Sequence, residues 1–451
     1  MVPPLGHPDL SAGRRRLAFL AVFYLFSLLL VGAQLPTPLY RVFQEAFGFS
    51  PLVLTLIFAS YAVAVIAGLL LLGPLSDSVG RRAPLVATLF LAAGASVLFA
   101  LAQATAVLFA ARVLQGLAVG IASGAAVAAL VELEPGGDRG RAALAATLAT
   151  VGGSALGPLL AGVLAEHVGG RSLPFVVHLG LLVPALVMMT LLTPSSGLRA
   201  ALTGWRPRRP AFPLDARRFV AATMAATAGW AMSGLFLAVI PSYAALLLDS
   251  DDLALLGGVV FLMLAASCAA QVAARATPAR RAMLAGLVAL IAGAALVALA
   301  FPTRSLAVLL TGSLIAGLGQ GLTWLGATTT INAIAPHDRR AEVSSTYFAA
   351  IYLGVSLAVV GVGALATAIS LEVAVYVFAA VISAGALVTI AVVARPPRPD
   401  HRVGGEAEDR GAGRDRGAVS PPGPCRATPS ARRRTWPSPV RPSPAAPREP
   451  W

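Results

Sequence analysis

The stretch Gly73-Pro74-Leu75-Ser76-Asp77-Ser78-Val79-Gly80-Arg81-Arg82 is a short charged turn between two long apolar runs. Glycine tolerates the backbone conformations that a tight turn requires, and Gly73 and Gly80 stand on either side of the acid. Paired arginines beside an apolar run are typical of loops on the cytoplasmic side of a membrane. The stretch therefore predicts a tight hairpin between two membrane-spanning helices, with Arg81 and Arg82 in the cytoplasm.

The composition indicates that most of the chain lies in a bilayer. Of the 451 residues, 57% are hydrophobic and 12% are charged, whereas a soluble domain averages about 25% charged residues. A spanning helix needs about 20 apolar residues, and the chain offers roughly twelve such runs. The runs are continuous rather than alternating, which favours helices over a β-barrel. We expect spans at 17–37, 51–72, 83–102, 106–131, 142–165, 173–193, 219–247, 254–274, 282–301, 306–333, 343–366 and 372–394.

The positive charge follows the loops. The net charge is +14, which by itself could suggest binding to nucleic acid, but every basic residue is an arginine and the arginines gather in alternate loops. Those loops hold 18 arginines and the other loops hold Arg41, Arg171 and Arg304. The positive-inside rule then places both termini in the cytoplasm. We expect a multi-pass protein of the plasma membrane that binds no nucleic acid.

The two halves of the chain resemble each other. A polar segment from Thr193 to Arg218 divides the runs into six and six, and several residues recur at an offset of 201. A fixed offset predicts a duplicated six-helix unit, repeated in parallel. The pairs are Gly116 and Gly317, Gly120 and Gly321, Gly153 and Gly354, and Gly162 and Gly363; Pro38-x-Tyr40 recurs as Pro241-x-Tyr243.

The expected organisation has five parts. A cytoplasmic N-terminus (1–16) precedes an N-terminal six-helix bundle (17–193), a cytoplasmic linker (194–218) and a C-terminal six-helix bundle (219–394). The rest, 395–451, is dense in proline and arginine and has almost no apolar periodicity. Such a composition predicts a disordered cytoplasmic tail.

Six helices repeated in parallel around a cytoplasmic linker resemble the major facilitator superfamily over residues 15 to about 395. The family signature between the second and third helices is Gly-x-x-x-Asp-Arg-x-Gly-Arg-Arg, and Gly73, Asp77, Gly80, Arg81 and Arg82 match it, with Ser78 in place of the first arginine. The resemblance implies an all-α fold of twelve transmembrane helices. It also implies a conformational latch in which Asp77 pairs with arginines in one state and releases them in the other. The alternative is a turn whose arginines only set the topology.

A second motif lies in the fourth run. Arg112, Gln115 and Gly116 resemble the Arg-x-x-x-Gly pattern of family members that exchange drugs for protons. A guanidinium inside a span costs several kcal/mol unless it is paired or faces polar groups, so Arg112 is a candidate for transport or coupling, with Gln34 as a polar neighbour. The alternative is an interfacial arginine whose side chain extends to the headgroups.

A third motif lies in the fifth run. Gly153, Gly157, Pro158 and Gly162 are similar to the Gly-Pro motif that marks exporters in the superfamily. Small residues four apart permit close helix contact, and proline introduces a kink. The alternative is ordinary small-residue packing.

The remaining candidates line a cavity or carry protons. Aromatic and amide side chains suit an amphipathic ligand, and the cavity candidates are Gln34, Tyr61, Trp230, Gln320, Trp324, Asn332 and Tyr347. Proton coupling requires a titrating group, for which Glu132 and Glu342 are the candidates. No catalytic, metal-binding or cofactor-binding pattern is present, so neither an enzyme nor a cofactor is expected.

These observations predict a secondary transporter that exports a small amphipathic compound in exchange for protons, with the lipid bilayer as its environment and a monomer sufficient. Two alternatives remain open. The first is an uptake permease or uniporter, which the absence of an acid in the first span fits. The second is a receptor or assembly factor that keeps the fold without transport.

Overall fold

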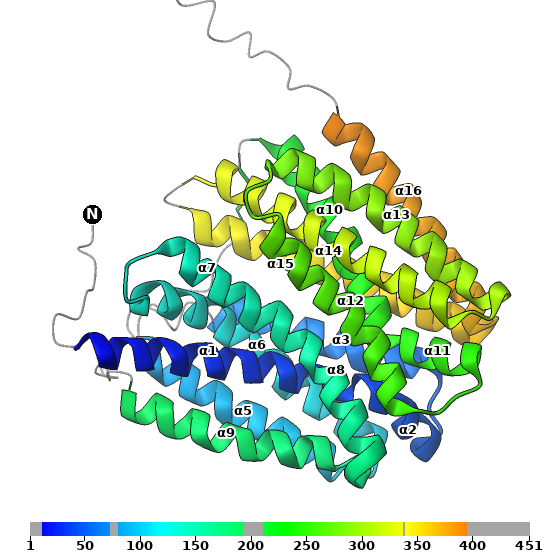
Figure 1. Cartoon of the computed structure of the whole chain (residues 1–451), viewed down its shortest axis with the longest axis horizontal. Helices are drawn as coiled ribbons and strands as arrows, with labels where there is room; N and C mark the ends of the chain where they lie inside the picture. The colour runs from blue at the N-terminus through cyan, green and yellow to red at the C-terminus, as the bar shows by residue number, and fades with distance from the viewer. Residues whose placement is uncertain (1–10, 73–79, 193–210, 214, 337–338, 395–451) are drawn as a thin grey trace, which may run out of the picture. The chain divides into compact units, whose positions relative to one another are not determined.

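Twelve helices long and apolar enough to cross a membrane form the described part of the chain (Figure 1). The computed structural model describes residues 11–72, 80–192, 211–213, 215–336 and 339–394. The predicted all-α fold is confirmed. The helices are α1 (Ala12–Gln34), α2 (Pro36–Phe47), α3 (Pro51–Ala67), η1 (Gly68–Leu72), α5 (Arg82–Ala100), α6 (Thr105–Leu133), α7 (Arg139–Thr147), η2 (Leu148–Gly152), α8 (Gly153–Leu164), η3 (Ala165–Gly169), α9 (Leu173–Leu192), α10 (Ala216–Ala238), α11 (Ile240–Leu248), α12 (Leu253–Ala273), α13 (Ala279–Thr303), α14 (Leu306–Ile334), α15 (Arg340–Ala368) and α16 (Leu371–Ala394), with the η segments π-helical.

Two of the predicted single helices are interrupted. The expected span 17–37 is α1 followed by α2, which meet at Leu35, and the expected span 219–247 is α10 followed by α11, which meet at Val239. Proline stands at the start of each second helix, and it lacks the N–H that would continue the hydrogen bonding of the first. The repeated Pro-x-Tyr pattern therefore lies in the first turn after the break in both halves, and in the first half a further proline, Pro36, starts the helix.

The glycines that recur at an offset of 201 make the same helix contacts in each half. A Cβ on Gly120 of α6 would lie 2.6 Å from the Val65 carbonyl oxygen of α3. A Cβ on Gly321 of α14 would overlap the Ser267 carbonyl oxygen of α12. In both halves the fourth span thus packs backbone to backbone on the second span, which only glycine permits.

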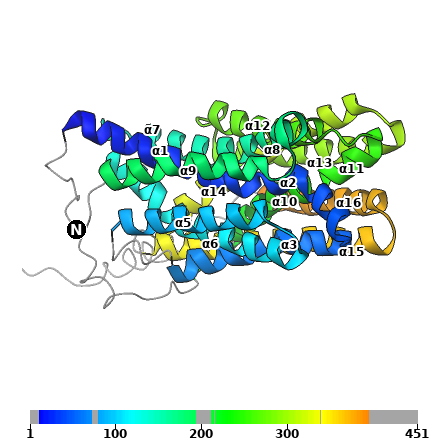
Figure 2. The same cartoon turned by 90° about the horizontal axis from the view of Figure 1, so that it is seen from below.

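The fifth span of each half joins its own bundle to the other. A Cβ on Gly153 of α8 would lie 2.7 Å from the Ser27 carbonyl oxygen of α1, and Gly162 packs on Leu253 at the start of α12 in the other half. In α15, Gly354 packs on Thr227 of α10, and Gly363 packs on Thr55 of α3. Both views show α3 beside α15 and α8 beside α12 (Figure 2).

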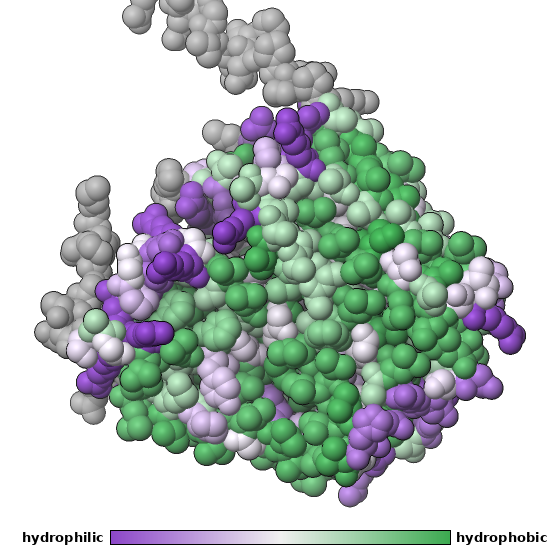
Figure 3. All heavy atoms as spheres, viewed as in Figure 1, coloured by the Kyte–Doolittle hydropathy of each residue, from purple (hydrophilic) through white to green (hydrophobic). Residues whose placement is uncertain are grey.

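Polar residues gather at two ends of the molecule, with an apolar band between them (Figure 3). We call one the arginine-rich end: there the Arg15 guanidinium donates to the Glu132 carbonyl oxygen, and Arg280 donates to that of Ala394. The opposite, arginine-poor end holds Arg41 and Arg171. A band of apolar side chains between two polar ends is what a bilayer requires.

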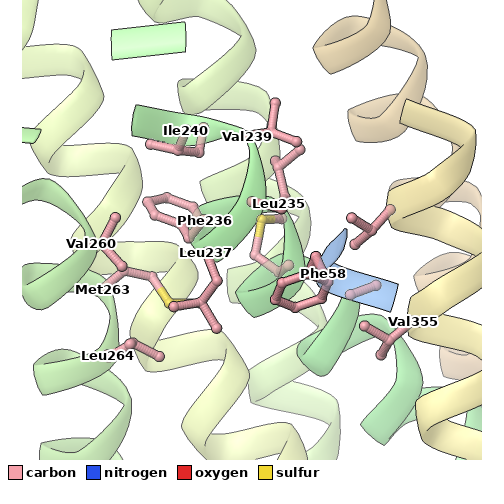
Figure 4. Close-up of a cluster of buried hydrophobic side chains, with 14 of the residues drawn as sticks. Phe58, Leu235, Phe236, Leu237, Val239, Ile240, Val260, Met263, Leu264 and Val355 are labelled. Carbon is pink, nitrogen blue, oxygen red and sulfur yellow. The ribbon is translucent and has the colours of Figure 1, made fainter. Parts of the chain in front are cut away.

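The hydrophobic core passes between the two halves. Phe58 of α3 lies among Leu235 of α10 and Val355 of α15, as the close-up shows (Figure 4). Gly234 lets these helices approach, since a Cβ there would lie 2.7 Å from Val359 Cγ2. The two bundles are therefore held together by apolar packing in the middle of the membrane-spanning part.

Candidate functional site

Arg112 is a fully buried guanidinium, with 1% of its surface exposed. Its Nε donates to the Tyr40 hydroxyl, and its Nη1 donates to the Ala33 carbonyl oxygen at 2.6 Å and to Gln115 Oε1 at 3.0 Å. The Tyr40 and Tyr61 rings lie 5.2 and 5.4 Å from the guanidinium carbon, as cation–π partners. The alternative of a side chain that reaches the headgroups is excluded by this burial.

The break between α1 and α2 builds part of this site. Pro36 has no N–H to offer the Gly32 carbonyl four residues earlier, and the Gln115 side-chain amide donates to that carbonyl at 2.8 Å instead. Gln115 thus satisfies a backbone acceptor and also accepts from Arg112. Gly116, one residue further on, packs on the α3 backbone at Tyr61 and holds α6 close enough for these bonds.

The guanidinium has no carboxylate partner among the described residues. None of the ion pairs found there includes Arg112, and its Nη2 has no hydrogen-bond partner. Gln34, the expected neighbour, is buried nearby on α1, but the two side chains share no hydrogen bond; its Oε1 is also without a partner. Hydrogen bonds to uncharged acceptors and cation–π contacts, rather than an ion pair, therefore compensate for the charge.

Four of the seven predicted cavity residues lie in one aromatic cluster that joins the halves. The Trp230 ring of α10 packs against the Trp324 ring in a tilted arrangement, with centroids 5.0 Å apart, and meets the Tyr352 ring edge-on at 5.3 Å. The Trp324 ring in turn stacks on the Tyr347 ring, with centroids 6.1 Å apart. On the other side, Tyr61 of the first half belongs to the same buried cluster as Tyr352 and Trp230. The rings thus lead from the second half to Tyr61, which covers Arg112.

The other two second-half candidates lie outside this cluster. Gln320 accepts the Ser267 hydroxyl, and Gln271 donates to Ser267 at 3.2 Å, so Gln320 belongs to a polar cluster between α12 and α14. Asn332 is exposed near the arginine-rich end, where its carbonyl accepts from Arg340 at 3.3 Å.

The two candidate carboxylates lie at the arginine-rich end. Glu132 pairs with Arg81 at 3.1 Å, which joins α6 to the start of α5, and Glu342 pairs with Arg339 at 2.9 Å. Gly80 adopts a φ of 82°, which explains the glycine before the two arginines. The predicted latch residues Gly73 and Asp77 lie outside the described residues, as do most of the predicted linker and the predicted tail.

The α8 motif divides its contacts between the halves. Gly153 and Gly157 pack on α1, where a Cβ on Gly157 would lie 2.8 Å from Gln34 Cβ. Pro158, inside the helix, faces Gly257 of α12, since a Cβ on Gly257 would overlap the Pro158 carbonyl oxygen. The motif therefore places a helix of the first half directly against one of the second.

Sequence reasoning missed several residues of these sites. Tyr40 was noted only as part of a repeat, although its recurrence beside a proline was a usable signal. Nothing in the sequence pointed to the contacts that close the arginine-poor end. There Arg41 pairs with Asp251 of the other half at 2.5 Å, and the Glu166 carboxylate accepts the Leu253 N–H at 3.0 Å.

The comparisons with known proteins agree with this geometry. The family model described as Major Facilitator Superfamily matches residues 17–307 and 273–447. The chain belongs to that superfamily. Among solved structures, this facilitator is similar to a crystal structure of a bacterial homolog of the human lysosomal transporter Spinster, in an inward-facing and unoccupied conformation. The TM-score is 0.63 at 16% identity, with 85% of this chain and 95% of that chain covered. A search of curated proteins found no match.

Membership of the superfamily makes this facilitator a multi-pass membrane transporter. Its two six-helix halves meet through α3 with α15 and α8 with α12. The structural similarity to the solved transporter shows a common fold, and at 16% identity it carries no information on what this facilitator transports.

Proposed function

We propose that this protein exports a small amphipathic compound by alternating access, in exchange for protons. The observation that carries the proposal is the aromatic cluster of Trp230, Trp324, Tyr347 and Tyr352, which extends to Tyr61 in the other half. Large rings with few polar groups suit a ligand that is mostly apolar. A cluster shared by both halves changes when the halves rock, as substrate release requires.

The contacts at the arginine-poor end support a two-state mechanism. With the termini in the cytoplasm, that end faces outward, and Arg41–Asp251, Glu166 to Leu253, and Thr367, which accepts the Leu52 N–H at 3.0 Å, close it. The described arrangement then corresponds to an inward-facing or occluded state. The Gly-Pro motif of α8 lies within this contact, which agrees with its predicted association with export.

Proton exchange is assigned to the carboxylates at the arginine-rich end. Protonation of Glu132 would remove its charge and weaken the pair with Arg81 that ties α6 to α5. Glu342, paired with Arg339 three residues away on the chain, would respond similarly but without joining two spans. Glu132 is therefore the stronger candidate for coupling.

A growth panel tests export. The protein is expressed in a bacterium that lacks its own efflux pumps, and tolerance to chemically varied toxic compounds is compared with that of Trp230→Ala. Phe90→Ala is the matched control because its ring is 62% exposed on α5, away from the cluster. Export predicts raised tolerance that Trp230→Ala loses and Phe90→Ala keeps. Equal tolerance with and without the protein for every compound would argue against export.

Uptake is the second candidate function. In the first span, residues 12–47, the one acid is Glu45 at the far end of α2. The rest of this span offers no carboxylate for proton exchange, which favours uptake. Proteoliposomes that are loaded at one pH and diluted into a buffer of another pH measure the direction of transport. Inward accumulation of a labelled compound that is independent of the pH gradient would support uptake and contradict the export proposal.

A further inference from the structure

Two buried polar atoms without a partner in and near the aromatic cluster can only donate hydrogen bonds, and the unpaired acceptor Gln34 Oε1 on α1 bonds to neither of them. Arg112 Nη2 and Trp230 Nε1 are both buried and have no partner. Neither a guanidinium nor an indole can accept a hydrogen bond, so only an acceptor can satisfy them. Buried donors without partners cost free energy in a folded protein, which suggests that something absent from the protein itself supplies the acceptor.

The charge is confined to one half. The position that matches Arg112 at the offset of 201 is Ser313, whose hydroxyl donates to the Leu309 carbonyl of its own helix at 2.7 Å. No carboxylate among the described residues pairs with Arg112. A buried cation without a counterion is strongly disfavoured unless a partner arrives.

We infer that the transported compound is an amphipathic organic anion, whose acidic group binds Arg112 and whose apolar body lies on the aromatic cluster. The planar guanidinium matches a carboxylate geometrically, and Nη2 offers it a free donor. Tyr61 stands between Arg112 and the rings of the second half, so an acid at Arg112 places its apolar part against Tyr352 and Trp230. This inference rests on the proposed function and names its substrate class.

Three probes of one shape test the charge: 1-naphthylacetate, its uncharged amide 1-naphthylacetamide, and the cation 2-(1-naphthyl)ethylammonium. Binding is measured by calorimetry with the full-length protein in lipid nanodiscs. We expect the carboxylate to bind at least about tenfold more tightly than the amide, about 1.4 kcal/mol, and the cation to bind weakest. Equal binding of the three, or preference for the cation, would overturn the inference.

Variants assign the preference to Arg112. Arg112→Gln should bind the carboxylate and the amide equally, whereas Arg112→Lys should keep part of the preference because it keeps the charge. If Arg112→Gln does not fold, the Lys variant and the three wild-type affinities still decide the point. A preference that survives intact in Arg112→Gln would place the anion elsewhere and overturn the assignment.

Acetate and chloride separate an organic anion from a simple one. Binding of either as tightly as naphthylacetate would show that the apolar body is irrelevant, and would overturn the amphipathic class. Failure here is distinct from failure of the proposed function. A growth panel that shows export while no naphthyl probe binds refutes the anion alone; Arg112-dependent binding without any raised tolerance refutes export alone.

Discussion

Substitution of Gly257 by alanine should open the arginine-poor end of the molecule. A Cβ at Gly257 would overlap the Pro158 carbonyl oxygen and lie 3.0 Å from its carbonyl carbon, so it meets the backbone of the other half. Backbone cannot rotate away as a side chain can, and the two helices have to separate. Gly258, the next residue on α12, has nothing within 4 Å of a Cβ, which makes Gly258→Ala the matched control.

The magnitude follows from the cost of overpacking. Forcing an extra methyl group into a packed contact costs typically 1–3 kcal/mol. If only the state closed at the arginine-poor end suffers this cost, the ratio of open to closed molecules rises roughly 5–150-fold. Gly258→Ala gains only helix propensity, about 1 kcal/mol. That gain is the same in both states because α12 is a helix in each.

Spin labels measure the separation. In a background with Cys268→Ala and Cys425→Ala, the labels are attached at Ala46→Cys of α2 and Ala368→Cys of α15, which are exposed at the arginine-poor end of different halves. Pulsed electron–electron double resonance should show a larger population with long distances between the two labels in Gly257→Ala than in Gly258→Ala. Identical distance distributions in the two folded variants would refute the role of this crossing in gating.

Three further outcomes are expected. Tyr40→Phe removes the acceptor of Arg112 Nε and should lower the melting temperature by more than Tyr243→Phe. Hydrogen bonds to charged groups contribute about 1.5–3 kcal/mol and those between neutral groups about 1 kcal/mol. Equal melting temperatures of the two variants would contradict this. Gly116→Ala should destabilise the protein in the same assay, whereas Gly124→Ala, with open space around it, should not. Asp251→Asn removes an exposed ion pair with Arg41, which contributes about 0–1 kcal/mol. We therefore expect the ratio of molecules open to molecules closed at the arginine-poor end to rise by less than about fivefold. A larger rise, measured from the label distances, would show that the pair dominates closure.

The architecture could be predicted from the sequence because apolar length and loop charge are properties of each segment by itself. The offset of 201 between glycines predicted a duplicated unit, and Gly116 and Gly317 pack on corresponding helices. The breaks at Leu35 and Val239 were not predicted, although Pro36 and Pro241 indicate them, because apolar residues continue through both positions.

The site was harder because a membrane helix that is apolar all round does not reveal which side faces a neighbour. Arg112 could be identified from the free-energy cost of burying a guanidinium in a membrane span. Its hydrogen bond to Tyr40 depends on the direction that α2 takes after the break. Asn332 and Trp324 lie on the same helix, and both their depth along α14 and their angle about its axis separate an exposed amide from a ring in the cluster. Such rotations depend on contacts between distant segments.

The reciprocal contacts of α8 and α15 have a consequence for how such a chain could arise. Gly162 of the first half meets the start of α12, and Gly363 of the second half meets Thr55 of α3. Each half therefore contributes its fifth span to the other half's second span, which makes the contact isologous, as in a two-fold symmetric homodimer. A single six-helix chain with this surface carries both sides of the interface and is complementary to its own copy.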